Sequence, residues 1–325
     1  MRPALLIPAA AWLLAAWLRA DARPAFRLEE VLSVGGPQSD LLSMWVGAAV
    51  DSEGFIYLTD ALEGTLKKFD SNGRPVKKAA WPRPPNDAFR VRRYPLDLWD
   101  RAIFVVVPSP FQSSIRMFDA NLEPKGSIVL DEAADDLQAL PGGLLAYSSV
   151  SLSKGGAGRV KIIDLAGRPR RTIACGQRDD PPALSALDFR FGADGSLYVV
   201  FNYLDRIAKF DGRGRLLWAR GLLGVTRVKT KKILFADLPE TPTFKDIALD
   251  GRGRLFVLGG GYSAHRSRDV YILDSEGRLL GSLILPQPSH CLVIDGRGFL
   301  YAREDEGMTI KKFRVIVQGE NDARL

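Results

Sequence analysis

Apolar and polar positions repeat along this chain in a pattern that first appears in full between Val50 and Arg74. There an Asp/Gly turn precedes an apolar segment, FIYLTD, and a polar loop leads to a second segment, TLKKF, and a second turn, DSNG. The same order returns from Phe191, from Leu249 and from Ile294. Short alternating segments joined by tight turns predict antiparallel β-strands.

Six copies of this unit follow one another along the chain. Their first turns fall near residues 51, 99, 141, 193, 250 and 295, a spacing typical of propeller blades. A β-helix or another open solenoid would need a shorter and stricter period. We therefore predict an all-β, six-bladed β-propeller of four-stranded antiparallel blades, forming one domain over residues 23–325. The blades are expected at about 45–81, 95–130, 136–174, 186–222, 244–285 and 291–317.

The sixth copy supplies only three strands before a polar tail. A fourth strand is available at the other end of the chain, where FRLEEVLSV, Phe26 to Val34, alternates but precedes the first complete copy. If it pairs beside Thr309 to Val317, the ring closes and no blade keeps an open edge. We expect this pairing.

The quoted segments resemble the NHL-repeat family and related exported six-bladed propellers of bacteria. The likeness is carried by VDSEGFIYLTD with LKKFDSNGR, by IALDGRGRLFVL with VYILDSEGR, and by VIDGRGFLYAR with IKKF. It covers nearly all of the chain after residue 22 and is weaker in the second and third copies. The resemblance implies the fold; because the family includes binding modules and lyases, it implies little about activity.

The first 22 residues predict export. They contain Arg2, an apolar run and a small-residue cleavage site, ADA, which together are typical of a signal peptide. An uncleaved membrane anchor is the alternative, although the run is short for a span. We expect a monomer in the periplasm or the extracellular space. The net charge of +7 favours anionic partners, and export argues against nucleic acid.

The two cysteines of an exported chain invite a disulfide. Topology argues against it, because Cys175 ends the outer strand of blade three while Cys291 begins the inner strand of blade six, half a ring away. Bonded cysteines need Cα atoms within about 7 Å. We predict two unpaired, buried thiols.

The order of strands assigns every connection to one of two faces. With strand one of each blade innermost, the one-to-two and three-to-four turns share one face, the turn face. The two-to-three loops and the links between blades share the opposite one, the loop face. Seven aspartates fall on the turn face, where Asp nucleates tight turns and Gly supplies positive φ, so we interpret them as turn residues rather than calcium ligands. They are Asp51, Asp70, Asp194, Asp211, Asp250, Asp274 and Asp295.

Many cations belong to the loop face, where propellers usually hold ligands. The hypothesis is a basic rim that attracts an anionic ligand or an acidic partner; ordinary solvated charge is the alternative, since Arg74, Arg252 and Arg297 belong to the turn face. The loop-face cations are Arg83, Arg90, Arg92, Arg93, Arg178, Arg227, Lys229, Lys231, Lys232, Arg266 and Arg268.

Both histidines also fall on the loop face. His265 lies in the two-to-three loop of blade five and His290 in the link to blade six, in sectors next to Arg303 and Glu304. Imidazole and carboxylate are the groups of a metal or general-base site, but two histidines at unrelated spacing indicate such a site only weakly. The lyases related to this fold use more histidines than two. A lactonase-type metal site remains open, because four residues at the ends of second strands have suitable oxygens, although turn roles explain them as well: Asp60, Asn202, Asp205 and Glu304.

We expect a binding or scaffolding module without a cofactor, presenting a basic loop face to a protein, a glycan or another anionic ligand. The alternative is a metal-dependent, lactonase-like hydrolase or lyase at the channel mouth, using a divalent metal. No HExxH, CxxC, P-loop or dinucleotide glycine motif is present. The candidate ligand-binding residues are Asp60, Arg92, Arg178, Asn202, Asp205, His265, Arg266, His290, Arg303 and Glu304.

Overall fold

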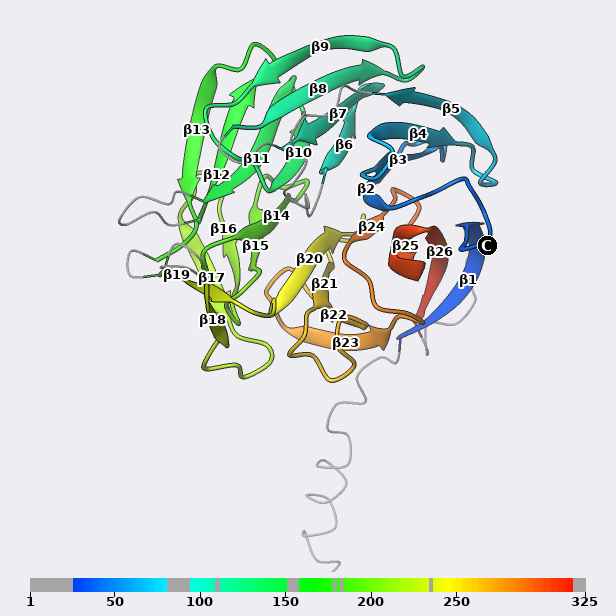
Figure 1. Cartoon of the computed structure of the whole chain (residues 1–325). Helices are drawn as coiled ribbons and strands as arrows, with labels where there is room; N and C mark the ends of the chain where they lie inside the picture. Colours follow the sequence, from blue (N-terminus) through cyan, green and yellow to red (C-terminus); the bar gives the residue numbers. More distant parts are fainter. Residues whose placement is uncertain are drawn as a thin grey trace, which may run out of the picture.

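Six four-stranded antiparallel sheets surround a central axis, as the sequence predicts (Figure 1). The computed structural model describes residues 26–80, 94–108, 112–150, 158–177, 180–181, 184–233 and 236–317. The predicted signal peptide, residues 1–22, lies outside this part of the chain. Among the described residues, no helix has the length and apolar character that a membrane span needs.

The strands of each blade follow one another from the inside to the outside of the ring, except that the last blade takes its outer strand from the N-terminal end. In blade order they are β2 (Trp45–Val50), β3 (Ile56–Asp60), β4 (Thr65–Phe69), β5 (Pro75–Ala80); β6 (Leu96–Trp99), β7 (Ala102–Val107), β8 (Ser114–Asp119), β9 (Pro124–Val129); β10 (Asp136–Leu140), β11 (Leu144–Val150), β12 (Gly158–Asp164), β13 (Pro169–Ala174); β14 (Leu187–Phe191), β15 (Leu197–Phe201), β16 (Ile207–Phe210), β17 (Leu216–Arg220); β20 (Phe244–Leu249), β21 (Leu255–Gly259), β22 (Asp269–Leu273), β23 (Leu279–Ile284); and β24 (Leu292–Ile294), β25 (Phe299–Glu304), β26 (Thr309–Val317), β1 (Phe26–Gly35).

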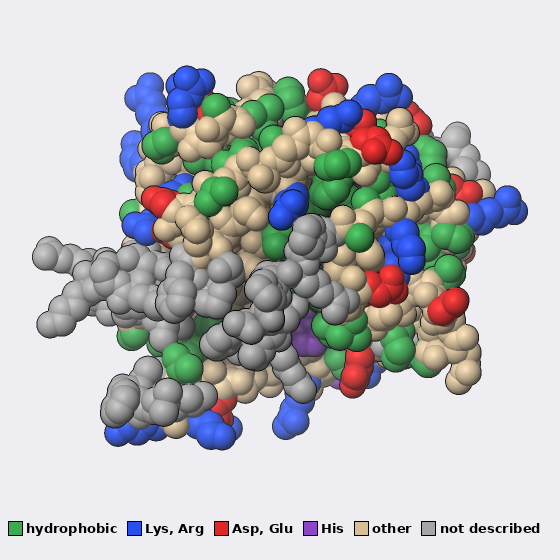
Figure 2. All heavy atoms as spheres, turned by 45° about the horizontal axis from the view of Figure 1, so that its top comes forward, with side chains coloured by type: hydrophobic (Ala, Val, Ile, Leu, Met, Phe, Trp, Pro, Cys, Tyr) green, Lys and Arg blue, Asp and Glu red, His purple; other side chains and the backbone are tan. Residues whose placement is uncertain are grey.

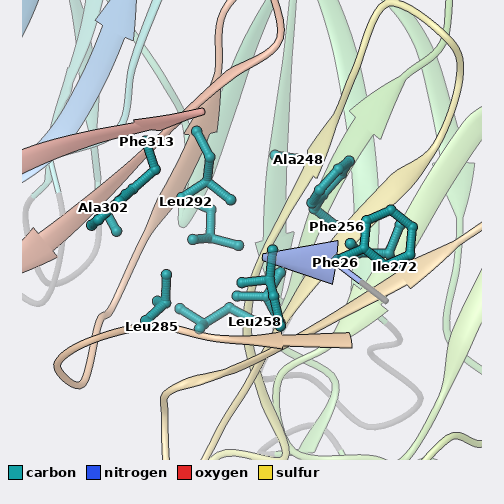
Figure 3. Close-up of a cluster of buried hydrophobic side chains, with 12 residues drawn as sticks. Phe26, Ala248, Phe256, Leu258, Ile272, Leu285, Leu292, Ala302 and Phe313 are labelled. Atoms are coloured by element: carbon teal, nitrogen blue, oxygen red, sulfur yellow. The ribbon is translucent and has the colours of Figure 1, made fainter. Parts of the chain in front are cut away.

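The hydrophobic core lies between neighbouring blades rather than at the centre of the ring. Second strands such as β3, β15 and β21 are buried on both faces, whereas the outer strand β5 is almost wholly exposed. Figure 3 shows one such layer, in which Phe256 and Leu258 of blade five meet Leu292 and Phe313 of blade six. Because each sheet is covered on both sides, its second strand has an apolar run instead of an alternating pattern.

The ring closes through the N-terminal strand. β1 pairs antiparallel with β26, from Phe26 opposite Val317 to Gly35 opposite Thr309. The indole Nε1 of Trp45 then donates to Thr309 O at 2.8 Å, which ties blade one to blade six. Contacts between inner strands run in a full cycle through β2, β6, β10, β14, β20 and β24.

The Asp/Gly turns have the chemistry that their sequence predicts. In blade one, Asp70 Oδ1 accepts hydrogen bonds from Asn72 N and Arg74 N, and Gly73 has a φ of 79°. The same arrangement recurs at Asp164, Asp211, Asp250 and Asp274. These carboxylates are therefore used to close turns.

The cysteines and two of the connections between strands remain to be placed in this fold. Cys175 and Cys291 are both buried and form no disulfide with each other, which confirms the prediction. The insertion between blades four and five contains a β-hairpin of β18 (Thr230–Ile233) and β19 (Ala236–Pro239). A short 3-10 turn, Asp305–Gly307, joins β25 to β26.

Replacing Phe26 by Ala should lower the free energy of unfolding by about 3 kcal/mol, because it removes an aromatic ring from the layer between blades five and six. Val31 on the same strand is 45% exposed, so Val31→Ala should change stability by less than about 0.5 kcal/mol. Urea unfolding of the two variants measures the difference. Equal losses would contradict a stabilising role for the buried end of β1.

Candidate functional site

The central channel is lined by the six inner strands, and each of these strands is the inner edge of its sheet. Their inward N–H groups therefore have no partner in the sheet itself. For some of these N–H groups, an aspartate of the preceding blade is the hydrogen-bond acceptor. Asp97 accepts from Ala139 N at 2.8 Å, and Asp136 accepts from Phe189 N at 3.1 Å. In the same way Asp246 accepts from Leu292 N at 2.8 Å. These bonds link successive blades around the channel.

Arg190 of β14 lies among these carboxylates. Its Nη1 is 2.7 Å from Asp136 Oδ2 in blade three, and its Nη2 is 3.7 Å from Asp246 Oδ1 in blade five. Although burial lowers the pKa of Arg190, Asp136, Asp246, Asp97 and Asp188 together raise it, so the guanidinium stays charged. Within this cluster of described residues one cation faces four carboxylates.

The Asp97 carboxyl of this group has a raised pKa. Burial raises its pKa to about 6, against the lowering effect of hydrogen bonds from Ala139 N and Leu98 N. Arg190 also lowers it, and Asp136 raises it. The residue is of intermediate exposure. Near neutral pH this carboxyl is thus close to its titration range.

Asp60, a candidate metal ligand from the sequence, holds together the loop-face end of blade one. It accepts from Ser43 N at 2.8 Å and from Met44 N at 3.3 Å, and Lys67 Nζ is 3.1 Å away. Burial by itself raises the pKa of Asp60. The backbone donors at Ser43 and Glu63 and the Lys67 ammonium lower it by more, so the net shift is downward. Asp60 is an ionised structural residue with its oxygens already engaged.

Asn202 and Asp205 also have structural partners. Asn202 Nδ2 donates to Asp188 Oδ2 at 2.8 Å, and its backbone carbonyl accepts from Thr243 N at 2.6 Å. Asp205 accepts from Leu222 N and Leu223 N, both at the start of the insertion that leads to the β18–β19 hairpin. The two side chains therefore organise the connection between blades four and five.

His265 forms a close pair with a carboxylate of its own loop rather than with blade six. Its Nδ1 is 2.6 Å from Asp269 Oδ1, and its backbone N–H donates to Asp269 Oδ2 at 2.9 Å. The side chain is 47% exposed, so the ring reaches solvent. Arg266, beside it, is exposed and has a φ of 38°. An oriented, accessible imidazole of this kind is chemically suited to act as a base.

His290 has a different partner, since its Nδ1 is 3.0 Å from Lys245 Nζ. Arg303 is buried and donates through Nη2 to Glu306 O. Glu304 is also buried, with Lys311 Nζ 3.2 Å from its Oε2. The two histidines predicted to lie in neighbouring sectors are thus each committed to a separate local contact.

The remaining candidates from the sequence, Arg92 and Arg178, lie outside the described residues. Within the ranges that the structure covers, no three His, Cys, Asp or Glu side chains are arranged as a metal site would need. Figure 2 shows Lys and Arg side chains interspersed with Asp and Glu on the face in view.

A cavity of about 490 Å³ lies beside blade one, between β4, β5 and the link around Asp40 and Leu41. Four lysines line it: Lys67, Lys68, Lys77 and Lys78. Lys67 donates to Leu41 O and pairs with Asp60, Lys68 lies over the Phe55 ring, and Lys77 pairs with Glu123. Much of its positive charge is already engaged within the protein.

Sequence reasoning missed the channel cluster of Asp97, Asp136, Asp188, Arg190 and Asp246. A usable signal was present, because each of these charges interrupts an apolar inner strand: LDLW, DLQAL, LDFRF and FKDIAL. Charged residues are rarely buried unless they are paired. Such interruptions therefore mark positions where a buried charge needs a partner, and Arg190 finds its partners, Asp136 and Asp246, on the two neighbouring blades.

Comparison with known proteins places the chain by its fold. No family model matches it, and no curated protein matches it. Among solved structures it is similar to a catalytically inactive virginiamycin B lyase from Staphylococcus aureus, at 12% identity and a TM-score of 0.58 over 90% of this chain and 100% of that one. It is also similar to regucalcin, a calcium-binding protein from Agrobacterium tumefaciens, at 15% identity and a TM-score of 0.53 over 86% and 92% of the two chains.

A luciferin-regenerating enzyme is a third similar structure, at 13% identity and a TM-score of 0.57 over 91% of this chain and 96% of that one. At such identities the likeness shows a six-bladed propeller fold and carries no activity with it. The narrower resemblance to NHL repeats stays a prediction.

Replacing Asp97 by Asn should raise the free energy of unfolding by about 1 kcal/mol above pH 6, after allowance for solvent in the channel. The folded carboxyl has a raised pKa, so ionisation costs stability as the pH rises from about 4, the unfolded pKa, to about 6. The amide oxygen of Asn can still accept from Ala139 N. Urea unfolding at pH 4, 5, 6 and 7.5 measures the effect.

Asp136→Asn is the control for this experiment, because Asp136 is the close charge partner of Arg190. That variant should be less stable than the parent protein across the range. A difference between Asp97→Asn and the parent that does not change between pH 4 and pH 6 would refute the role assigned to Asp97.

Proposed function

We propose that this protein is an exported binding module whose loop face takes an anionic ligand, a glycan or an acidic protein segment. The observation that carries the proposal is the β18–β19 hairpin, an element that the repeat itself does not require. It follows β17 in the chain and precedes β20, and so belongs to the connection between blades four and five. An insertion that breaks a regular repeat on the ligand-binding face is a natural place for recognition.

The hairpin is fixed in place rather than left as a loose loop. Asp205 Oδ1 accepts from Leu222 N at 2.8 Å, and its Oδ2 accepts from Leu223 N at 2.9 Å and from Val225 N at 3.0 Å. At the other side Lys229 N donates to the Tyr262 hydroxyl at 2.8 Å. The Asp205 bonds hold the start of the insertion to blade four, and the Lys229 bond joins it to the two-to-three loop of blade five.

The insertion and this loop are rich in exposed cations. Arg227, Lys229, Lys231 and Lys232 are exposed along the insertion, and Arg266 is exposed in the loop that holds Tyr262. We call these five residues the hairpin patch. Clustered charges of one sign attract an oppositely charged partner and speed its association. A preorganised surface also loses less conformational entropy when the partner binds.

Reversing the charge of Lys231 and Lys232 together should weaken binding to a sulfated polysaccharide, heparin, by about tenfold, because two attractive charges become repulsive. The matched control is the reversal of Lys77 and Lys78, two exposed lysines on β5 that lie away from the hairpin patch. Both variants lose the same net charge. Binding is measured by titration calorimetry at two salt concentrations.

An equal loss in both variants would show that binding follows net charge alone and would contradict a localised site. Retention of full affinity by the hairpin variant would also contradict it. A glutamate-rich peptide used in the same titration separates an acidic protein partner from a glycan.

A second candidate function is a hydrolase or lyase, and the specific observation that favours it is the His265–Asp269 pair. Asp269 orients the imidazole through Nδ1, which leaves Nε2 to take a proton from water or substrate. Because His265 belongs to the same loop as Arg266 and Tyr262, an anionic substrate held by the hairpin patch would lie close to this base.

If His265 is a catalytic base, His265→Gln should lower the turnover of a lactone or ester substrate by about 10²-fold or more. His290→Gln serves as the control, because His290 is paired with Lys245 instead of a carboxylate. A panel of chromogenic lactones and carboxylic, phosphate and sulfate esters, with and without a chelator, measures turnover. Equal rates for the two variants, or no turnover of any substrate by the parent, would count against the enzyme.

A further inference from the structure

The turn face carries a group of cations of its own, where blade three meets blade four. These two blades are neighbours in the ring (Figure 1). The turn between β12 and β13 ends in Arg168, and β13 continues with Arg170 and Arg171. The turn between β16 and β17 contains Arg213 and Arg215. All five residues are exposed, and we call them the arginine cluster.

The fold brings the two halves of the arginine cluster together. Arg171 Nη1 of blade three donates to Gly212 O of blade four, directly before Arg213 in the chain. A Cβ on Gly214 of the same turn would lie 3.2 Å from Ile173 Cγ2 on β13. The turn of blade four therefore packs on the outer strand of blade three, and its cations lie beside those of β13.

The carboxylates beside these cations are largely covered, whereas the cations reach solvent. Arg168 Nε and Arg170 Nη2 each lie 2.8 Å from Asp164 Oδ2, and Arg215 Nε lies 3.2 Å from Asp211 Oδ2. The two carboxylates also accept backbone N–H groups of their own turns, and their side chains are 12% and 24% exposed. The Arg168 and Arg215 side chains are 71% and 79% exposed. Because exposed ion pairs are weak, these guanidinium groups stay available to a further anion.

Exposed leucines lie at both ends of the arginine cluster. Leu165 follows Asp164 in the turn of blade three, and Leu216 and Leu217 follow Arg215 at the start of β17. A single exposed leucine is common on protein surfaces. Cations next to exposed leucines, however, are the combination that lies at a lipid interface, where the charges meet the headgroups and the apolar side chains enter the layer below. A soluble polyanion offers nothing to the leucines.

The described chain also begins on the turn face. Phe26 starts β1 opposite Val317 at the end of β26, and the Arg254 guanidinium in the one-to-two turn of blade five lies 6.0 Å from the Phe26 ring. The apolar run within residues 1–22 precedes Phe26 by a few residues of sequence. If this run were kept as an anchor, the propeller would be attached to the membrane from the face that carries the arginine cluster.

We propose that the arginine cluster and the leucines beside it dock the propeller on a membrane surface that contains anionic phospholipids. A guanidinium group binds two phosphate oxygens at once, and each cation near an anionic surface adds to the attraction. The docking leaves the loop face, on the opposite side of the ring, free for a ligand of its own. It does not depend on what the hairpin patch binds.

The test measures flotation of the full chain with two kinds of vesicle, one an equimolar mixture of phosphatidylglycerol and phosphatidylcholine and the other phosphatidylcholine alone. The second kind measures any binding that the apolar run within residues 1–22 contributes. The parent should bind the anionic vesicles more tightly, and added salt should reduce the difference.

Replacing Arg171 and Arg213 together by Gln should lower the affinity for the anionic vesicles about tenfold or more, because two cations at the centre of the cluster are lost. The matched control replaces Lys231 and Lys232 by Gln, which removes the same charge from the loop face. This control should bind the vesicles as the parent does. Thermal unfolding establishes that each variant is folded.

Replacing Leu216 and Leu217 together by Ser distinguishes a membrane from a soluble polyanion. This variant should bind the anionic vesicles several-fold more weakly and should bind heparin, measured by titration calorimetry, as the parent does. If it does not fold, the arginine variant decides the question through the same two measurements, because it should lose more affinity for the vesicles than for heparin.

The proposal would be overturned if the parent bound both kinds of vesicle equally, or if the arginine variant and the lysine control lost affinity to the same extent. Full vesicle binding by the folded leucine variant would also overturn it. An arginine variant that lost heparin binding but kept vesicle binding would assign the cluster to a soluble polyanion instead of a membrane.

Discussion

The antiparallel pairing of β1 with β26 is the interaction on which the rest of the structure depends. It joins the two ends of the described chain into one sheet, and it supplies the outer strand that blade six lacks. Without it, the layer that contains Phe26, Leu258 and Phe313 would lose one of its walls. Because each blade is stabilised mainly by its two neighbours, closure places all six blades in the same cooperative unit.

Closure also creates a constraint at the centre, where six inner edges face one another. Backbone donors on a sheet edge need partners, and the aspartates of blades two, three and five provide them across the blade boundaries. Their negative charge is in turn moderated by Arg190. The ring architecture therefore accounts for the polar channel. Its carboxylates already accept hydrogen bonds between blades, so a ligand in the channel would compete with these bonds.

Residues that stabilise the fold and residues that are available for recognition differ between the two faces of the ring. Turn-face carboxylates such as Asp70 are used within their own turns. On the loop face, Asp60, Asn202 and Asp205 hold connections together, whereas the hairpin patch and the His265–Asp269 pair provide groups beyond what the repeat needs.

The periodicity of the sequence was enough to predict six blades, the inside-to-outside strand order and the closing strand, because each depends on local turn chemistry and on alternation within a few residues. The separation of Cys175 from Cys291 followed from that order. The interaction partners of the candidate site residues could not be predicted in this way. The sequence named His265 and Asp205 but not the carboxylate that orients the first or the backbone donors that surround the second.

Tertiary structure alone decided which charges meet. Arg190 lies 54 residues from Asp136 and reaches Asp246 on the other side, a grouping that depends on how three blades are rotated about the axis. The same holds for Trp45 and Thr309, whose hydrogen bond needs blade one to lie beside blade six. Local pattern determines elements and their order, because strands and turns form from neighbouring residues. Long-range electrostatic partners are determined only when the ring closes and brings separate blades to one place.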